Sequence, residues 1–183
     1  MAETMAEGMA ESMAEKLPLS VIVITKNEED RIERCLASVK NVADEIVVFD
    51  SGSTDATVEI VKRYTDKVFV TDWPGYGAQK QRALDAASHD WVLQVDADEE
   101  LTPELEEDIN RVLKSNPTEV AFKIPWAVII FGKQLNYGRS ARSAKRLFRK
   151  QGAQFSNDIV HEKLTVMPGK MGKLKGKLNH YSI

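Results

Sequence analysis

The sequence has one cysteine, few aromatic residues and no long apolar run, and each shortage excludes a class of protein. Because Cys35 is the only cysteine, the chain can form neither an intrachain disulfide nor a cysteine-based metal site. The longest apolar run, around Ile124–Phe131, is far shorter than the roughly 20 residues that a membrane-spanning helix needs. The amino terminus has neither the basic nor the apolar region of a signal peptide, so we expect a cytoplasmic protein.

The composition predicts one globular domain. Hydrophobic residues make up 43% and charged residues 29% of the 183 residues, which is enough for a hydrophobic core and a solvated surface. The first sixteen residues are four tetrads that each begin Met-Ala-Glu. A helix this short is marginal in water, so we expect residues 1–17 to be a disordered low-complexity extension and residues 18–183 to form the domain.

The charge is unevenly distributed. Residues 133–183 contain twelve lysines and arginines against two acidic residues, although the whole chain has a net charge of −3. A basic carboxy-terminal third indicates an anionic partner, either a phosphorylated glycolipid or a membrane surface. The alternative is a flexible basic tail. We do not expect a nucleic-acid partner, because the aromatic residues are few and are not interleaved as stacking platforms.

Apolar runs and helical spacings alternate along the amino-terminal half. The predicted strands are Leu19–Ile24, Glu45–Phe49, Lys67–Val70 and Trp91–Val95. Between them, residues 32–39 keep the spacing of a one-sided helix with Asn27 as a candidate cap, and residues 58–64 and 78–87 have helical character. This β-α-β-α-β order predicts a parallel sheet with helical crossovers.

The carboxy-terminal half predicts short strands separated by turns. They are expected at Val120–Ile124, Val128–Phe131, Arg146–Arg149, Ile159–Val166 and Lys173–Leu178. Residues 103–113 between the two halves form an amphipathic helix, with Thr102 as its cap and Pro103 in its first turn. The predicted fold class is therefore α/β, a mostly parallel sheet with antiparallel carboxy-terminal strands.

Acidic residues follow the predicted strands, where ligands bind in parallel sheets. Asp96 and Asp98 come directly after the strand at Trp91–Val95. Two carboxylates about 4 Å apart repel by about 1 kcal/mol in water and by about 4 kcal/mol at an effective dielectric constant of about 20. Such a pair is stable beside a hard cation, which predicts Mg²⁺ or Mn²⁺. The alternative is a solvated acidic turn.

Several segments together are similar to one enzyme family. They are SVIVITKNE, DEIVVFDSGSTDATVEI, GYGAQKQRAL, WVLQVDADEEL, RLFRK and IVHEKL. In this order they resemble family 2 glycosyltransferases of the GT-A fold, and more narrowly the branch of lipopolysaccharide-core β-1,4-glucosyltransferases. The resemblance extends from about Leu19 to Tyr181. Members of the branch continue into a further segment, so the domain is expected to be shortened at its carboxy end.

The resemblance implies a nucleotide-sugar donor, UDP-glucose, and a glycolipid acceptor of the cell envelope. The donor-binding residues that it implies are Thr25, Asn27, Glu28, Asp50, Asp55, Lys80 and Asp96. Asp98 is implied as the direct metal ligand, with Asp96 between the metal and the ribose. The metal would stabilise the leaving nucleoside diphosphate as a Lewis acid.

An inverting transfer needs one carboxylate that removes the proton of the acceptor hydroxyl. The resemblance assigns this role to Glu162, with Asp158 as the second candidate. His161 is either a group behind the site or a residue on a strand face. His180 could approach the metal, but a lone histidine in a basic segment is more often neither ligand nor base.

The leading hypothesis is a metal-dependent inverting glycosyltransferase that contacts the inner face of an anionic membrane peripherally. The alternative is a truncated nucleotide-sugar-binding domain with weak transfer. A sugar nucleotidyltransferase is disfavoured, because it would need a glycine-rich, basic loop after the first strand. The sequence there, at residues 25–30, is TKNEED, which has no glycine and is acidic.

Overall fold

The computed structural model describes residues 16–135 and 142–182, so the predicted extension at residues 1–17 lies almost entirely outside the described residues. The amino-terminal half contains β1 (Leu19–Thr25), α2 (Ile32–Val39), β2 (Glu45–Asp50), α3 (Thr57–Val61), β3 (Val68–Val70), α4 (Tyr76–Ala86) and β4 (Trp91–Gln94). The carboxy-terminal half contains β5 (Glu99–Leu101), α5 (Pro103–Lys114), β6 (Ala121–Ile130), β7 (Lys133–Leu135), β8 (Ser143–Arg149), β9 (Gln154–Phe155), β10 (Leu164–Thr165), β11 (Met171–Lys173) and β12 (Leu178–Tyr181).

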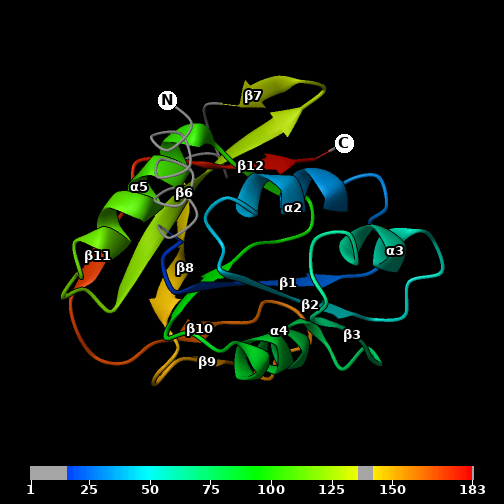
Figure 1. Cartoon of the computed structure of the whole chain (residues 1–183), viewed down its shortest axis with the longest axis horizontal. Helices are drawn as coiled ribbons and strands as arrows, with labels where there is room; N and C mark the ends of the chain where they lie inside the picture. The colour runs from blue at the N-terminus through cyan, green and yellow to red at the C-terminus, as the bar shows by residue number, and fades with distance from the viewer. Residues whose placement is uncertain (1–15, 136–141, 183) are drawn as a thin grey trace, which may run out of the picture.

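One large sheet runs through the molecule in the order β3-β2-β1-β4-β8-β6-β12-β5, and β7 and β11 also pair with β6 (Figure 1). Strands β3, β2, β1 and β4 are parallel to one another, as the alternation of strands and helices predicted. Strand β8 joins β4 and β6 in antiparallel pairs. The carboxy-terminal addition is itself mixed, because β11 and β12 run parallel to β6.

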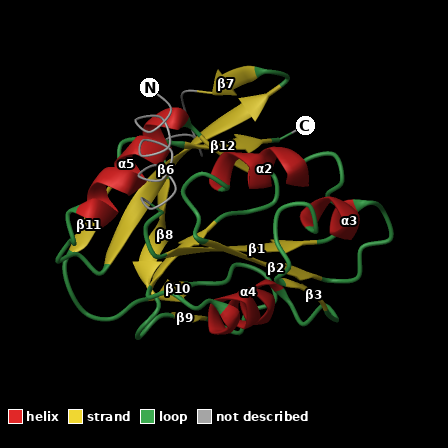
Figure 2. Cartoon of the chain, viewed as in Figure 1, coloured by secondary structure: helices red, strands yellow, loops and turns green. Residues whose placement is uncertain are grey.

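Helices cover both faces of the parallel strands, as Figure 2 shows with α2 and α3 on one side and α4 on the other. Alternate residues of β1 therefore enter two different cores. Val21 and Val23 pack with the α2 face that includes Leu36, and Ile22 packs with Leu84 of α4. This double burial explains why β1 is apolar along nearly its whole length.

Two predicted strands form one in the structure. The runs at Val120–Ile124 and Val128–Phe131 are the single ten-residue strand β6, which contains Pro125. Proline lacks an N–H and is normally excluded from a central strand. Pro125 is accommodated because β6 changes partners there: residues up to Pro125 pair with β8, and Trp126 begins the pairing with β12. The predicted strand Lys173–Leu178 is also wrong, because it separates into the end of β11 and the start of β12.

The helix boundaries follow the predicted caps in one case and differ in another. Thr102 caps α5 as predicted, since its side-chain oxygen accepts a hydrogen bond from the Leu105 N–H at 3.2 Å. Asn27 does not cap α2, which begins at Ile32 after a turn. Asn27 instead adopts a left-handed backbone with φ 50°. Across residues 16–135 and 142–182, no helix combines the length and apolar character needed to cross a membrane.

Candidate active site

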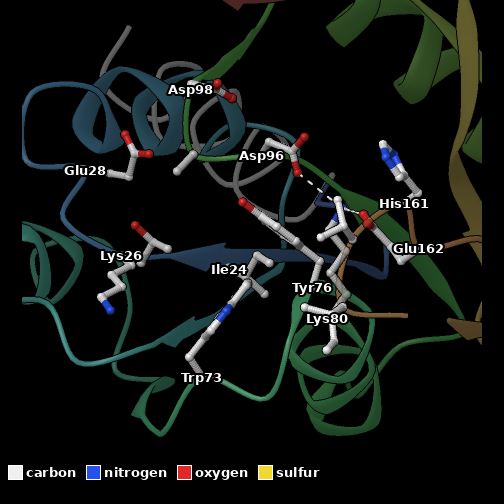
Figure 3. A pocket seen from close by; sticks show the side chains of 14 residues that line it. Ile24, Lys26, Glu28, Trp73, Tyr76, Lys80, Asp96, Asp98, His161 and Glu162 are labelled. Carbon is white, nitrogen blue, oxygen red and sulfur yellow. Dashed lines mark hydrogen bonds and ion pairs between the residues drawn. The ribbon is translucent and has the colours of Figure 1, made fainter. Parts of the chain in front are cut away.

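A cavity of about 780 Å³ lies at the carboxyl ends of β1 and β4 (Figure 3). Its wall comes from four short segments: the end of β1, the start of α4 with the loop before it, the turn after β4, and the loop between β9 and β10. The first three segments are neighbours because β1 pairs with β4 and α4 packs against β1. Parallel strand ends therefore form the cavity, as expected for an open α/β sheet.

The turn after β4 places the carboxylates of Asp96 and Asp98 in this wall. Around Asp96, the Lys80 Nζ lies 3.6 Å from Oδ1 and the Arg146 Nη2 lies 3.3 Å from Oδ2. Burial alone would raise the pKa of Asp96, but these two cations hold it well below its usual value. Asp96 is therefore a fixed anion whose charge is already balanced by the protein.

Asp98 is in a different electrostatic position. Burial raises its pKa, His180 lowers it, and the nearby Asp96 raises it again, so that the net shift is upward. The His180 Nδ1 lies 3.5 Å from Asp98 Oδ1, because β12 pairs with β5 and brings His180 beside the turn. A cation bound in the cavity would relieve the burial cost of Asp98 more than that of Asp96.

The carboxylates in the cavity wall suit a divalent metal ion that is bound jointly by the protein and by a phosphate ligand. Within the described residues, no three histidine, cysteine, aspartate or glutamate side chains come together closely enough to hold a metal ion alone. Magnesium sites commonly use one or two carboxylates, with substrate phosphates and waters as the remaining ligands. Asp98 and Asp96 could supply that protein share.

Lys80 connects the two sides of the cavity, as the dashed lines in Figure 3 indicate. Its ammonium group forms an ion pair with Glu162 and lies close to Asp96. The Lys80 and Glu162 side chains are only 9% and 17% exposed. A buried lysine with carboxylates on two sides is a site at which an anionic ligand can compete for the positive charge.

The segment that carries Glu162 is a loop, so the predicted strand Ile159–Val166 is wrong except at Leu164 and Thr165. The N–H groups of Tyr76 and Gly77 donate to the carbonyl oxygens of Ile159 at 3.1 Å and Asp158 at 3.2 Å. The first turn of α4 has free N–H groups, so it satisfies this loop backbone in place of a neighbouring strand.

Within this loop, only one of the two predicted bases lines the cavity, and His161 does not lie on a strand. Glu162 lines the cavity, whereas the exposed Asp158 does not and accepts a hydrogen bond from Ser156 Oγ at 2.7 Å. His161 also lines the cavity and has a left-handed backbone with φ 63°. The interpretation of His161 as a strand-face residue is therefore wrong.

Of the five predicted donor-binding residues at and after the ends of β1 and β2, two line the cavity and three do not. Thr25 and Glu28 are in the wall. Thr25 is 5% exposed, and its hydroxyl has no hydrogen-bond partner within the described part of the chain. Burial raises the pKa of Glu28, although the adjacent Arg31 opposes the shift.

Asn27, Asp50 and Asp55 use their side chains to build the neighbouring turn at residues 50–57. Asp50, which is fully buried, accepts hydrogen bonds from the N–H groups of Gly52 at 2.9 Å and Ser53 at 2.7 Å. Asn27 Oδ1 accepts from the Thr54 N–H at 2.8 Å, and Asp55 Oδ1 accepts from the Thr57 N–H at 3.0 Å. None of the three is in the cavity wall.

Sequence reasoning missed an apolar part of the wall. Trp73, Tyr76, Ile159 and Val160 all line the cavity and are largely exposed. The rings of Trp73 and Tyr76 meet edge to face with centroids 4.8 Å apart. The loop sequence WPGYG contains these aromatic residues, but only the contact between α4 and the β9–β10 loop brings them to the cavity. The aromatic part of the wall suits a ligand with a flat ring, and Lys80 with the acidic part suits a diphosphate that carries a divalent cation.

Known proteins that resemble the chain agree with this geometry. Residues 20–170 match the family described as glycosyl transferase family 2. The chain is 39% identical to an uncharacterized glycosyltransferase of Rickettsia typhi, with 90% of this chain and 60% of that protein covered. It is 34% identical to the lipopolysaccharide core biosynthesis glycosyltransferase LpsC of Rhizobium meliloti, with 91% and 64% covered. The chain thus spans about 60% of the length of these relatives.

Solved structures with a similar architecture include two that contain nucleotide sugars. TarS of S. aureus in complex with UDP-GlcNAc has a TM-score of 0.66 at 22% identity, over 90% of this chain and 58% of that one. Glucosyl-3-phosphoglycerate synthase of Mycobacterium tuberculosis, in complex with Mn²⁺ and UDP-glucose, has a TM-score of 0.50 at 28% identity, over 67% and 48%. The fold is therefore GT-A, as the sequence predicted.

Proposed function

Because the chain belongs to glycosyl transferase family 2, we propose that it moves glucose from UDP-glucose to a lipopolysaccharide-core or related glycolipid acceptor of the cell envelope, with inversion at the anomeric carbon. The observation that carries the proposal is the convergence of Asp98, Lys80 and Glu162 on one cavity at the ends of the parallel strands. The negative charge of Asp98 is less fully balanced by neighbouring cations than that of Asp96. Lys80 is a buried cation, and Glu162 is a carboxylate on the facing side of the cavity.

The chemistry of the wall supports a nucleotide-sugar donor. The Thr25 hydroxyl, which has no partner among the described residues, would bind the nucleoside, and Glu28 would accept a hydrogen bond from a ribose hydroxyl. Asn27, Asp50 and Asp55 contribute by holding the adjacent turn in shape. Asp98 and Asp96 would hold Mg²⁺ or Mn²⁺ beside the diphosphate. The metal would act as a Lewis acid and stabilise the charge of the departing UDP.

Glu162 acts as the general base of the transfer. The acceptor oxygen forms a bond to the anomeric carbon while the bond from that carbon to the UDP oxygen breaks, and the acceptor proton passes to Glu162. In the structure Lys80 forms an ion pair with Glu162. When the diphosphate competes for Lys80, the carboxylate of Glu162 is released to accept the proton. Donor binding therefore precedes activation of the base.

The acceptor and the cellular location are proposed on two grounds. The relative LpsC is named for lipopolysaccharide core biosynthesis, and the chain covers 64% of it. Residues 133–183 are strongly basic, which suits the phosphates of a glycolipid and the anionic inner face of a membrane. We therefore place the protein in the cytoplasm, in peripheral contact with that membrane.

The test separates the donor site from the base. Isothermal titration calorimetry would measure UDP-glucose binding in Mn²⁺ and in chelator, and the release or transfer of glucose would be followed by mass spectrometry. We expect Asp98→Asn to raise the dissociation constant of UDP-glucose in Mn²⁺ by about tenfold or more, which is the usual effect of substitutions at metal sites. We expect Glu162→Gln to bind the donor at least as tightly as the wild type, because the diphosphate no longer competes with a carboxylate for Lys80, and to lower turnover by about 10²–10⁴-fold.

The second base candidate and the alternative function are resolved by the same measurements. Asp158→Asn should retain turnover, because that side chain is turned toward Ser156. Donor binding that is equal in Mn²⁺ and chelator, and unchanged in Asp98→Asn, would contradict the proposed metal site. Since the chain spans about 60% of its relatives, a nucleotide-sugar-binding domain with weak transfer is the second candidate function. Binding of UDP-glucose without any turnover would favour it.

A further inference from the structure

A buried ion pair lies directly behind the Asp96–Asp98 turn. Arg146 comes from β8 and Glu99 from the first position of β5, and they are 5% and 1% exposed. The Arg146 guanidinium donates from Nη1 to Glu99 Oε1 at 2.9 Å and from Nη2 to Glu99 Oε2 at 3.1 Å. This two-pronged geometry fixes the direction of the guanidinium as well as its position.

Both partners also bind Asp96. Arg146 Nη2 donates to Asp96 Oδ2 at 3.3 Å, so the arginine holds the carboxylate. Glu99 Oε1 accepts a hydrogen bond from the Asp96 N–H at 2.7 Å, so the glutamate holds the backbone. Arg146 further donates to the carbonyl oxygen of Gln94, the last residue of β4. The turn is therefore fixed at its side chain, its backbone and the strand that precedes it.

The Arg146–Glu99 pair also determines how strongly Asp96 depends on Lys80 for a balancing positive charge. Arg146 neutralises one oxygen of Asp96 from behind, while Lys80 approaches the other oxygen from the cavity side at 3.6 Å. With Arg146 in place, Asp96 still has a balancing cation when Lys80 binds a diphosphate instead. Without it, Lys80 would be retained by Asp96, and Asp96 Oδ2 would lose its partner while Oδ1 kept the hydrogen bond from Gln94 Nε2 at 2.8 Å.

We infer that Arg146 and Glu99 are positioning residues that fix the Asp96–Asp98 turn for the metal-bound diphosphate. This inference rests on the proposed function. Neither residue touches the donor in this arrangement, so their effect acts through Asp96. Loss of the pair should weaken binding of the metal–nucleotide unit and leave the step at Glu162 nearly unchanged, because Glu162 belongs to a different loop.

The test uses Arg146→Lys and Glu99→Gln in the full chain. Lysine keeps the charge but cannot form the two-pronged contact, and glutamine keeps the shape but loses the charge. Calorimetry would give the dissociation constant of UDP in saturating Mn²⁺, and steady-state kinetics would give KM for UDP-glucose and kcat separately. We expect the dissociation constant of UDP and the KM for UDP-glucose to rise by about 10- to 100-fold, which is the usual effect of substituting groups that support metal ligands. We expect kcat to change less than threefold.

Arg149→Lys is a matched control. Arg149 lies on the same strand, pairs with Asp90 at 2.9 Å and stacks on Trp91, much as Arg146 lies over Trp126. It does not line the cavity. Arg149→Lys should lower thermal stability without changing the dissociation constant of UDP, which separates positioning from a general loss of packing.

The outcomes are distinct from those of the proposed function. If the wild type binds UDP with Mn²⁺ and Arg146→Lys and Glu99→Gln bind it equally well, the inference is overturned while the proposed function stands. A fall in kcat with unchanged KM would overturn it as well. If the Arg146→Lys, Glu99→Gln double variant is no weaker than each single variant, the two residues act as one unit, as inferred. Failure of the wild type to bind UDP would refute both proposals.

Discussion

Gly77 is the residue whose size matters most at the site. An added Cβ there would lie 1.8 Å from the carbonyl oxygen of Ser156, far inside normal contact. Alanine is favoured over glycine within a helix by about 1 kcal/mol, but the clash must move either α4 or the β9–β10 loop. Because Glu162 is on that loop, Gly77 helps to set the position of Glu162 relative to Lys80.

We therefore expect Gly77→Ala to lower turnover strongly. A shift of about 1 Å in a catalytic group can cost about 100-fold in rate, and donor binding at Thr25 and Asp98 should fall much less. Steady-state kinetics and calorimetry on the same preparation would measure both. Gly132→Ala is a comparison for lost stability alone: its added methyl group meets nothing within 4 Å, but its backbone φ of 74° is strained for alanine, so it should lower the melting temperature without lowering turnover. An unchanged kcat in Gly77→Ala would show that the loop adjusts without displacing Glu162.

At the residue scale, the sequence predicted the acidic and basic residues of the cavity wall better than the residues that support them. Asp96, Asp98, Lys80 and Glu162 were identified by resemblance, and all four line one cavity. Arg146 was part of a quoted segment, but its role depends on the antiparallel pairing of β8 with β4, which no local pattern encodes. Asn27, Asp50 and Asp55 bind the backbone of their own turn, a use of polar side chains that looks the same in sequence as ligand binding.

At the scale of elements, Glu45 joins four segments at the start of β2. Its carboxylate accepts hydrogen bonds from Ser20 of β1, from Lys67 before β3, and from the N–H and hydroxyl of Ser88 before β4. Burial would raise the pKa of Glu45, but the hydrogen bonds from Lys67, Ser20 and Ser88 outweigh it and lower the pKa to about 2. The ionised form is therefore favoured by folding.

This shift predicts how stability depends on pH. The contribution of Glu45 is present above its ordinary pKa of 4.5 and is lost as the pH falls toward about 2. Glu45→Gln should lower the free energy of unfolding by about 1–3 kcal/mol at pH 7, because buried donors lose their acceptor. Urea denaturation of both proteins at pH 7, 5 and 3 should show a difference that shrinks with acid.

The exposed Glu107 of α5 offers a control for the same chemical change. Glu107→Gln should be close to neutral at each pH, as surface substitutions usually are. A Glu45→Gln effect that stays constant between pH 7 and pH 3 would contradict the role given to its ionised carboxylate.

Strands were predictable where both of their faces are buried. The runs at β1, β2 and β4 are apolar because helices cover both sides, so length and composition sufficed. Strand β6 was divided in two because Pro125 normally ends a strand, and its tolerance depends on a change of partner. The segment at residues 159–163 has strand-like composition, but its backbone is bonded to α4, which is distant in sequence.

At the scale of the whole molecule, the cavity joins the two halves of the chain. Thr25 and Lys80 come from the amino-terminal half, and His161 and Glu162 come from the carboxy-terminal half. A ligand that binds across these segments stabilises the folded state as a unit. At 100 times its dissociation constant this amounts to about 2.7 kcal/mol.

We therefore expect UDP with Mn²⁺ to raise the melting temperature by about 5–10 °C at that saturation, given the usual response of a chain of this size. Differential scanning calorimetry would compare UDP with Mn²⁺, UDP with chelator, and Mn²⁺ alone. UDP with chelator should give a clearly smaller shift. The same shift with and without the metal would argue against a site in which Asp98 binds the diphosphate through a cation.

Strand β12 lies between β5 and β6, and it carries His180 to within 3.5 Å of Asp98. During synthesis on the ribosome, the aspartates emerge some eighty residues earlier than this histidine. A growing chain can thus assemble its parallel strands around β1 while the acidic turn still lacks one of its neighbours. The nascent protein completes the surroundings of Asp98 only after β12 has left the exit tunnel.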